Sequence, residues 1–187
     1  MCTLSDAYKE PVSSIGGFKV LPDYGLNDMP ENYAGLVLIG GMNWFSPLGE
    51  LIVPLVEKAV KENKLVAGIC NASVFLGMHG FLNEVKHTSN TLDYLKQYAG
   101  DKYTGDSNYI NKQAVRDGNI VTANGTGQLE FCKEILYALE ADTTDAIEES
   151  YLFYKNGFCP EMISLGSIIF ISLRKKISLR NRRVIQE

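Results

Sequence analysis

The feature that most constrains this chain of 187 residues is a run of apolar residues around one cysteine. The run stops at the cysteine and then resumes with helical spacing. Residues 65–69 are apolar or small, Cys70 ends the run, and apolar residues continue through position 76 at the spacing of a helix. The pattern predicts a strand, a sharp turn and a helix. A side chain on such a turn is confined by the strand end and the first helical turn, so its neighbours two positions away must be small, as Gly68 and Ala72 are.

Cys70 occupies the position of a nucleophile in this pattern. The helix that begins beside it presents free N–H groups and a partial positive charge to the sulfur, which favours the thiolate over the thiol. The alternative is a structural cysteine that ends a buried strand, because free cysteine is among the most buried residue types.

Composition places the chain among ordinary globular proteins. Its residues are 45% hydrophobic and 21% charged, and its length indicates one domain with a full-sized core. The first ten residues are polar and mixed in charge, unlike a secretory signal, so we expect a cytoplasmic protein. The four cysteines are too widely spaced for a disulfide framework or a zinc site, and the two histidines add no ligand spacing. We therefore expect no metal and no cofactor.

The rest of the chain alternates between predicted strands and predicted helices. We predict strands at residues 34–39, 66–69, 113–116 and 119–123, and helices at 47–63, 72–80, 91–98 and 128–140. Asp117-Gly118 indicates a hairpin between the last two strands. In the last helix, one face that we expect to meet the core carries Leu129, Cys132, Leu136 and Leu139. This alternation predicts an α/β fold, a mostly parallel sheet with helices on both faces.

Three segments follow strand ends in this scheme. They are Gly40-Gly41, Cys70, and the loop that contains Asn124, Gly125 and Thr126. Because the carboxyl ends of parallel strands meet at one edge of a sheet, we expect these segments to converge on one crevice, with Gly40 and the loop lining the pocket. Gly125-Thr126-Gly127 lacks the third glycine and the downstream acid of a nucleotide-binding fingerprint, so it is weak evidence for such a site.

Three segments together resemble the ThiJ/PfpI superfamily. They are the strand ending in Gly40-Gly41, the Gly68-Ile69-Cys70 turn, and residues 121–127 before a helix. The resemblance implies the flavodoxin-like fold of class I glutamine amidotransferases. It also implies that Cys70 is the reactive thiol, and that the backbone N–H groups of Gly41 and Asn71 form an oxyanion hole.

The resemblance runs from about Pro11 to about Gly157, so we expect an α/β domain at residues 1–157 and a divergent tail at 158–187. Members of the superfamily take a glutamate from the turn after their first strand. Little sequence precedes Pro11, so the domain is expected to lack the first strand and helix. The apolar strand edges exposed in this way invite association, and we expect a homo-oligomer.

The protease-like branch of the superfamily has a histidine directly after the cysteine, whereas this chain has Asn71. Cys70 therefore needs another partner, and the candidates are His87 and His79. His79 lies nine residues along the predicted helix, about 13 Å away by helical rise, and is expected at the surface. His87 follows the end of that helix and is the better candidate.

The tail has a segregated charge. Residues 162–173 are apolar and residues 174–183 hold six Lys or Arg residues, whereas the whole chain carries a net charge of −4. Twelve residues are too few to span a bilayer. One hypothesis is an anchor at an acidic lipid surface. The alternatives that we favour are a terminal strand with a solvated basic end and a tail altered by a change of reading frame, so membrane contact is not expected.

These patterns lead to one functional interpretation and its alternatives. We expect a cysteine-dependent hydrolase or amidotransferase-like protein that attacks a small carbonyl or amide substrate through Cys70. The alternatives are a noncatalytic, redox-sensing stress protein in which an oxidant modifies Cys70, and an inactive family member. The expected partner is a small-molecule substrate or oxidant, and not a nucleic acid.

Overall fold

The computed structural model describes residues 5–6, 8–14 and 16–157. The chain divides into two units, residues 1–144 and 145–187, and each is described by itself. The tail predicted at residues 158–187 lies outside the described residues.

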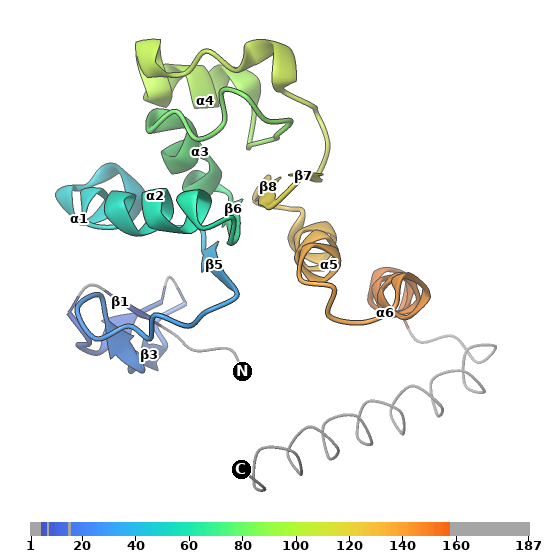
Figure 1. Cartoon of the computed structure of the whole chain (residues 1–187), viewed down its shortest axis with the longest axis horizontal. Helices are drawn as coiled ribbons and strands as arrows, with labels where there is room; N and C mark the ends of the chain where they lie inside the picture. The colour runs from blue at the N-terminus through green and yellow to red at the C-terminus, as the bar shows by residue number, and fades with distance from the viewer. Residues whose placement is uncertain (1–4, 7, 15, 158–187) are drawn as a thin grey trace, which may run out of the picture. The chain divides into compact units, whose positions relative to one another are not determined.

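A four-stranded sheet forms the centre of the first unit (Figure 1). Its strands, in spatial order, are β5 (Gly35–Leu38), β6 (Leu65–Ile69), β8 (Ile120–Ala123) and β7 (Ala114–Asp117). The first three are parallel and β7 is antiparallel to β8. The mostly parallel sheet predicted from the sequence is therefore confirmed. Gly118 has a φ of 55° in the tight turn from β7 to β8, which is why the Asp-Gly signal located this hairpin correctly.

Helices cover both faces of the sheet. Successive residues of a strand point to opposite faces, so neighbouring residues of β6 pack against different helices. Val66 packs with α2 (Val53–Lys61) and α3 (Asn71–Met78), whereas Leu65 and Ala67 pack with α5 (Gln128–Ala138). Figure 1 shows α2 and α3 on one side of β6 and α5 on the other. On α5, the side chain that enters the core is Phe131, whereas Cys132 is exposed, so the prediction that Cys132 faces the core is wrong. The helix carries apolar residues on more than one face, and contact with the sheet selects the face of Phe131.

The single helix predicted at residues 47–63 is in fact two. The helix α1 (Pro47–Glu50) ends before α2 begins, and Pro54 lies in the first turn of α2. A proline has no N–H to donate, and its ring would clash with the carbonyl four residues earlier, that of Glu50. Pro54 is therefore accepted at a helix start and forces the break.

Other elements complete the described chain. The helix α4 (Leu92–Ala99) packs against α3, and three short 3₁₀ helices lie at Asn43–Phe45, Gly100–Lys102 and Asp106–Asn108. Near the N-terminus, β1 (Ser5–Asp6) pairs with β4 (Tyr24–Gly25), and β2 (Val12–Ser13) pairs with β3 (Lys19–Val20).

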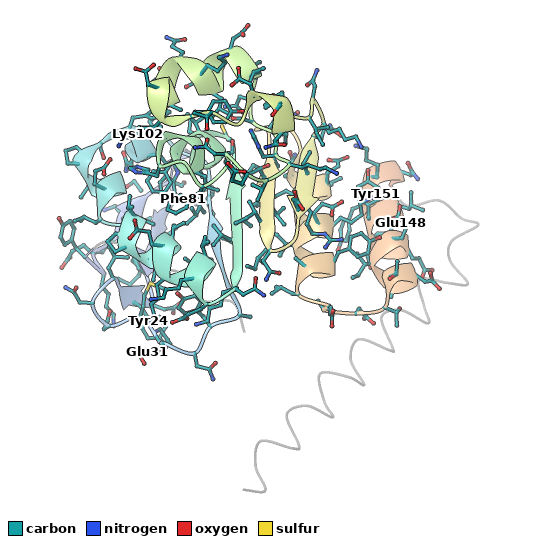
Figure 2. The ribbon with its side chains drawn as sticks, turned by 45° about the horizontal axis from the view of Figure 1, so that its top comes forward. Tyr24, Glu31, Phe81, Lys102, Glu148 and Tyr151 are labelled. Atoms are coloured by element: carbon teal, nitrogen blue, oxygen red, sulfur yellow. The ribbon has the colours of Figure 1, made fainter. Side chains whose placement is uncertain are left out.

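The helix α6 (Thr144–Asn156), which the sequence patterns did not predict, carries Glu148 and Tyr151 (Figure 2). None of the helices in the described ranges has the length and apolar character needed to cross a membrane.

β5 is an edge strand of the described sheet. It pairs with β6 on one side, and its side chains alternate between buried and exposed. Leu36 and Leu38 are each 7% exposed, whereas Val37 is 47% exposed and Ile39, directly after the strand, is 64% exposed. Association of chains through this edge stays a prediction.

Two adjacent residues of this segment provide a matched test of where the core lies. Replacing Leu38 with Ala should lower the free energy of unfolding by about 2–5 kcal/mol, because the change leaves a cavity in the core. Replacing Ile39 with Ala should change it by about 0.5 kcal/mol or less, because the side chain is mostly exposed. Urea denaturation of both variants measures the difference. Similar losses in the two would mean that β5 does not present these alternating faces.

Candidate active site around Cys70

Cys70 lies between the end of β6 and the start of α3 with φ 58° and ψ −128°. Such a conformation costs a non-glycine residue on the order of 1–3 kcal/mol, so its surroundings must hold it in place. The Cys70 N–H donates to the Ala123 carbonyl at 2.9 Å. The Cys70 carbonyl accepts from the N–H of Ser73 at 3.0 Å and from its hydroxyl at 2.6 Å.

The turn requires small neighbours. A Cβ atom on Gly68 would lie 3.2 Å from backbone atoms of Ala72 and 2.9 Å from Cδ1 of Leu76. Ala72 is itself fully buried. The strand, turn and helix predicted around Cys70 are therefore confirmed, together with the steric reason for the small residues. The role of Cys70 as nucleophile stays a prediction.

Three strand ends meet at the Cys70 side chain. A Cβ on Gly40, after β5, would lie 2.9 Å from Cys70 Cβ and 3.7 Å from its Sγ. A Cβ on Gly125, after β8, would lie 3.2 Å from the same Sγ. The two glycines allow the backbone to approach the sulfur closely, and the side chain of Cys70 stays partly exposed. The structure thus brings Gly40, Cys70 and Gly125 together.

The space beside Gly41 is open, since a Cβ there would have no heavy atom within 4 Å. Asn71 is the first residue of α3, so its backbone N–H has no acceptor within the helix. Its side chain is 6% exposed, and Nδ2 donates to the Gly41 carbonyl at 3.1 Å and lies 3.3 Å from Sδ of Met42. These contacts bring Gly41 and Asn71 together, and their service as an oxyanion hole stays a prediction.

The remaining loop residues shape the edge of the site. Oδ1 of Asn124 accepts from the backbone N–H of Thr126 at 2.9 Å and from its hydroxyl at 2.8 Å. The side-chain oxygen of Asn124 and the hydroxyl of Thr126 therefore form hydrogen bonds within the loop itself. In the described part of the chain, no three His, Cys, Asp or Glu side chains come together as a set able to hold a metal ion.

Sequence reasoning missed Asn90, which contacts Cys70 directly. Its Nδ2 donates to Cys70 Sγ at 3.5 Å and to Asn71 Oδ1 at 3.4 Å, and its Oδ1 accepts from the Gly125 N–H at 3.0 Å. The available signal was that Asn90 ends a polar stretch leading into a helix whose N-cap is Thr91. Residue type alone does not distinguish the Asn90 amide from the other polar side chains of that stretch.

The structure does not bring His87 to Cys70. His87 is fully buried, and Nδ1 lies 2.7 Å from the Val85 carbonyl while Nε2 lies 2.7 Å from the Tyr103 hydroxyl. In the neutral ring, Nδ1–H donates to the carbonyl and Nε2 accepts from the hydroxyl, so both nitrogens are bonded away from the site. Burial lowers the pKa of His87, with the Val85 carbonyl opposing, and burial raises the pKa of Tyr103. His87 therefore anchors its segment as a neutral side chain.

His79 lies at the end of α3, as predicted, but its side chain is more buried than expected. Its side chain is only 11% exposed, with Nε2 3.5 Å from Oε1 of Glu50. Its ring centroid lies 4.7 Å from that of Phe75 and 6.4 Å from that of Phe81, which Figure 2 labels. Burial lowers the pKa of His79, and Glu50 opposes that shift. The expectation of a surface histidine is wrong because aromatic rings pack around the end of α3.

Three aromatic rings pack together where the 3₁₀ helix Asn43–Phe45 meets α4. The ring centroid of Tyr98 lies 4.4 Å from that of Phe45 and 4.7 Å from that of Tyr94. Burial and then a hydrogen bond with Tyr98 raise the pKa of Tyr94, and the charge of Cys70 acts in the same direction.

Both the sequence and the fold are similar to those of known proteins. A model of the DJ-1/PfpI family matches residues 2–138. The chain belongs to the DJ-1/PfpI family. Within that family it is similar to "Uncharacterized protease YdeA" of Bacillus subtilis, with 42% identity over 147 residues, which is 79% of this chain and 73% of that protein.

Two further members of the DJ-1/PfpI family extend the comparison. The crystal structure of a ThiJ/PfpI family protein from Bacillus anthracis matches with a TM-score of 0.76 at 35% identity, covering 81% of this chain and 71% of that chain. "Glutathione-independent glyoxalase DJR-1.2" of Caenorhabditis elegans is 29% identical over 135 residues, which is 70% of this chain and 69% of that protein. These similarities confirm the family and the fold inferred from the sequence.

Alanine variants of the adjacent Gly40 and Gly41 test which of the two glycines is closely packed. Replacing Gly40 with Ala should lower the free energy of unfolding by about 1–3 kcal/mol, because the new methyl group overlaps Cys70 Cβ. Replacing Gly41 with Ala should leave it within about 0.5 kcal/mol, because the methyl group enters open space. Thermal and urea unfolding measure both. Equal stability of the two variants would contradict the close contact between Gly40 and Cys70.

The buried histidine makes stability depend on pH. Because burial lowers the pKa of His87 in the folded chain, the unfolded chain takes up a proton first as the pH falls below about 6.5. The free energy of unfolding should therefore be highest above that pH and decrease between pH 6.5 and 5, by at most about 1.4 kcal/mol per pH unit for this group. The slope should be smaller in His87→Gln, measured by urea denaturation. An unchanged slope would show that His87 is protonated equally in both states.

Proposed function

We propose that this protein uses Cys70 as a nucleophile toward the carbonyl carbon of a small substrate. The observation that carries the proposal is the setting of Sγ. It belongs to a strained residue where three strand ends meet, and it accepts a hydrogen bond from an amide. Open space lies beside Gly41, whose carbonyl accepts from the neighbouring Asn71. Strained backbone at the end of a parallel strand is a recurrent feature of catalytic positions.

The proposed step forms one bond and breaks one π bond. The thiolate sulfur adds to the carbonyl carbon, a C–S bond forms, and the π electron pair moves to oxygen. In this proposal, the backbone N–H groups of Gly41 and Asn71 donate to that oxyanion and stabilise it. With an aldehyde, a proton from water then gives the hemithioacetal. With an amide, the adduct must expel an amine that takes up a proton, and water must hydrolyse the thioester.

The chemistry around Sγ favours the aldehyde. The side-chain amide of Asn90 donates to the sulfur but cannot accept a proton from it or pass one to a leaving amine. Addition to an aldehyde requires no leaving-group protonation, whereas amide cleavage does. The names of the relatives include both a protease and a glyoxalase, and both kinds of enzyme act on an electrophilic carbonyl carbon. We therefore expect small aldehydes to react before amides.

Oxidation is the second candidate function, and the partial exposure of Cys70 favours it. A thiolate attacks an oxygen of hydrogen peroxide, an S–O bond forms and the O–O bond breaks, and hydroxide leaves and takes up a proton from solvent to become water, so that sulfenic acid remains on the cysteine. Selective peroxide oxidation of Cys70 without turnover of aldehydes or amides would support a redox sensor instead of an enzyme.

The two described cysteines give a matched test of reactivity. Cys132 is exposed and Cys70 is less so. If exposure alone set the rate, iodoacetamide would alkylate Cys132 faster. We expect Cys70 to be alkylated faster at pH 7, because the start of α3 and the Asn90 amide both favour the thiolate. Peptide mass spectrometry of the folded protein reads both rates in one sample. A faster Cys132 would remove the argument from the turn.

Turnover should depend on the same residue. Cys70→Ser should abolish consumption of a panel of small aldehydes and amides, while Cys132→Ser should leave it unchanged. Gly41→Ala should lower turnover without loss of stability, because its methyl group enters the space beside the oxyanion donors. Activity that survives in Cys70→Ser would overturn the proposed mechanism.

A further inference from the structure

A directional chain of amide hydrogen bonds surrounds Cys70. The Gly125 N–H donates to Asn90 Oδ1 at 3.0 Å, Asn90 Nδ2 donates to Asn71 Oδ1 at 3.4 Å, and Asn71 Nδ2 donates to the Gly41 carbonyl at 3.1 Å. The chain links the segment after β8 to the segment after β5. Asn90 stands in its middle, and its Nδ2 also donates to Cys70 Sγ.

The backbone groups at the two ends settle the orientation of both side chains. A backbone N–H only donates and a backbone carbonyl only accepts. Reversing the Asn90 amide would set its NH₂ against the Gly125 N–H and its oxygen against Asn71 Oδ1. Reversing the Asn71 amide would set its oxygen against the Gly41 carbonyl. The network therefore directs a donor, and not an acceptor, of Asn90 at the sulfur.

The segment before Asn90 is held by buried polar contacts. Thr88 and Ser89 are 0% and 1% exposed. The Thr88 N–H donates to Oγ1 of Thr122 in β8 at 2.8 Å, and the hydroxyls of Ser89 and Ser73 share a hydrogen bond of 2.8 Å. These contacts join the segment to β8 and α3, so the position of Asn90 is set by buried hydrogen bonds to two elements of the core.

We propose that Asn90 is the positioning residue of Cys70, directing an N–H donor at Sγ that favours the thiolate as the attacking form. The inference rests on the proposed function and adds the group that prepares the nucleophile. A hydrogen bond to a charged acceptor is roughly twice as strong as one to a neutral acceptor, so Asn90 favours the thiolate over the thiol. As the C–S bond forms and the charge moves to the carbonyl oxygen, that bond weakens. The amide takes up no proton at any stage, so Asn90 prepares the sulfur electrostatically and does not act as a base.

The test uses a change of one atom. Asn90→Asp keeps the shape of the side chain and an oxygen for the Gly125 N–H, but turns a carboxylate oxygen toward Sγ and Asn71 Oδ1. Two negative charges in contact disfavour each other. We expect alkylation of Cys70 by iodoacetamide at pH 7 to slow about tenfold or more, with the midpoint of its pH dependence about one unit higher. Asn90→Leu, which removes the donor without adding charge, should shift the midpoint in the same direction by less.

Two controls isolate the effect at the sulfur. Asn83 lies in the same connecting segment, and its side chain bonds to Lys102 and Thr104. Asn83→Asp should leave the Cys70 profile unchanged. Alkylation of Cys132 in each sample reports any general change in reagent or folding. Tyr94 stays protonated between pH 5 and 9, because its pKa is raised above an ordinary value near 10, so it does not titrate in this window.

The outcomes separate the two proposals. A Cys70 profile in folded Asn90→Asp that matches the wild type overturns the positioning role, even if turnover depends on Cys70. A shifted profile in a protein that turns over no aldehyde or amide supports the positioning role and overturns the proposed function. If Asn90→Asp does not fold, the profile of Asn90→Leu decides, and an unshifted midpoint there overturns the inference.

Discussion

The positive φ of Cys70 is the constraint on which the site depends. A residue at φ 58° persists only where neighbours leave no alternative, and here the bonds to Ala123 and Ser73 hold both sides of its peptide. The same conformation starts α3 directly after β6 and requires glycine at position 68. Because β6 lies between β5 and β8, the turn also determines which strand ends adjoin the sulfur.

The environment of the sulfur is built from neutral amides. Asn90, Asn71 and the backbone of Gly125 and Gly41 form one hydrogen-bonded chain around it, and the buried His87 is bonded to Val85 and Tyr103 instead. Amides donate to a thiolate and an oxyanion but do not transfer protons. This environment is the basis for the proposed addition to a reactive carbonyl, and the histidine holds the segment that ends at Asn90.

Local patterns predicted most of the fold. Spacing and residue size predict the Cys70 turn, the Asp117-Gly118 hairpin and the three parallel strands. Such local patterns are informative because backbone sterics act over a few residues. Errors arose where two local solutions competed. Helical spacing continued across Pro54, although the proline required a new helix start. In α5, two apolar faces were available, and contact with the sheet selected the face of Phe131.

The sequence by itself determined the strand, turn and helix at Cys70 and the meeting of Gly40, Cys70 and Gly125 at one sheet edge, because local geometry and parallel topology require them. Only the tertiary structure decided that Asn90, and not His87, reaches the sulfur. The side chain that a connecting segment presents depends on contacts between distant positions, such as the bond from Thr88 to Thr122 across 34 residues. No local spacing rule encodes that register, since long-range burial and hydrogen bonding set it.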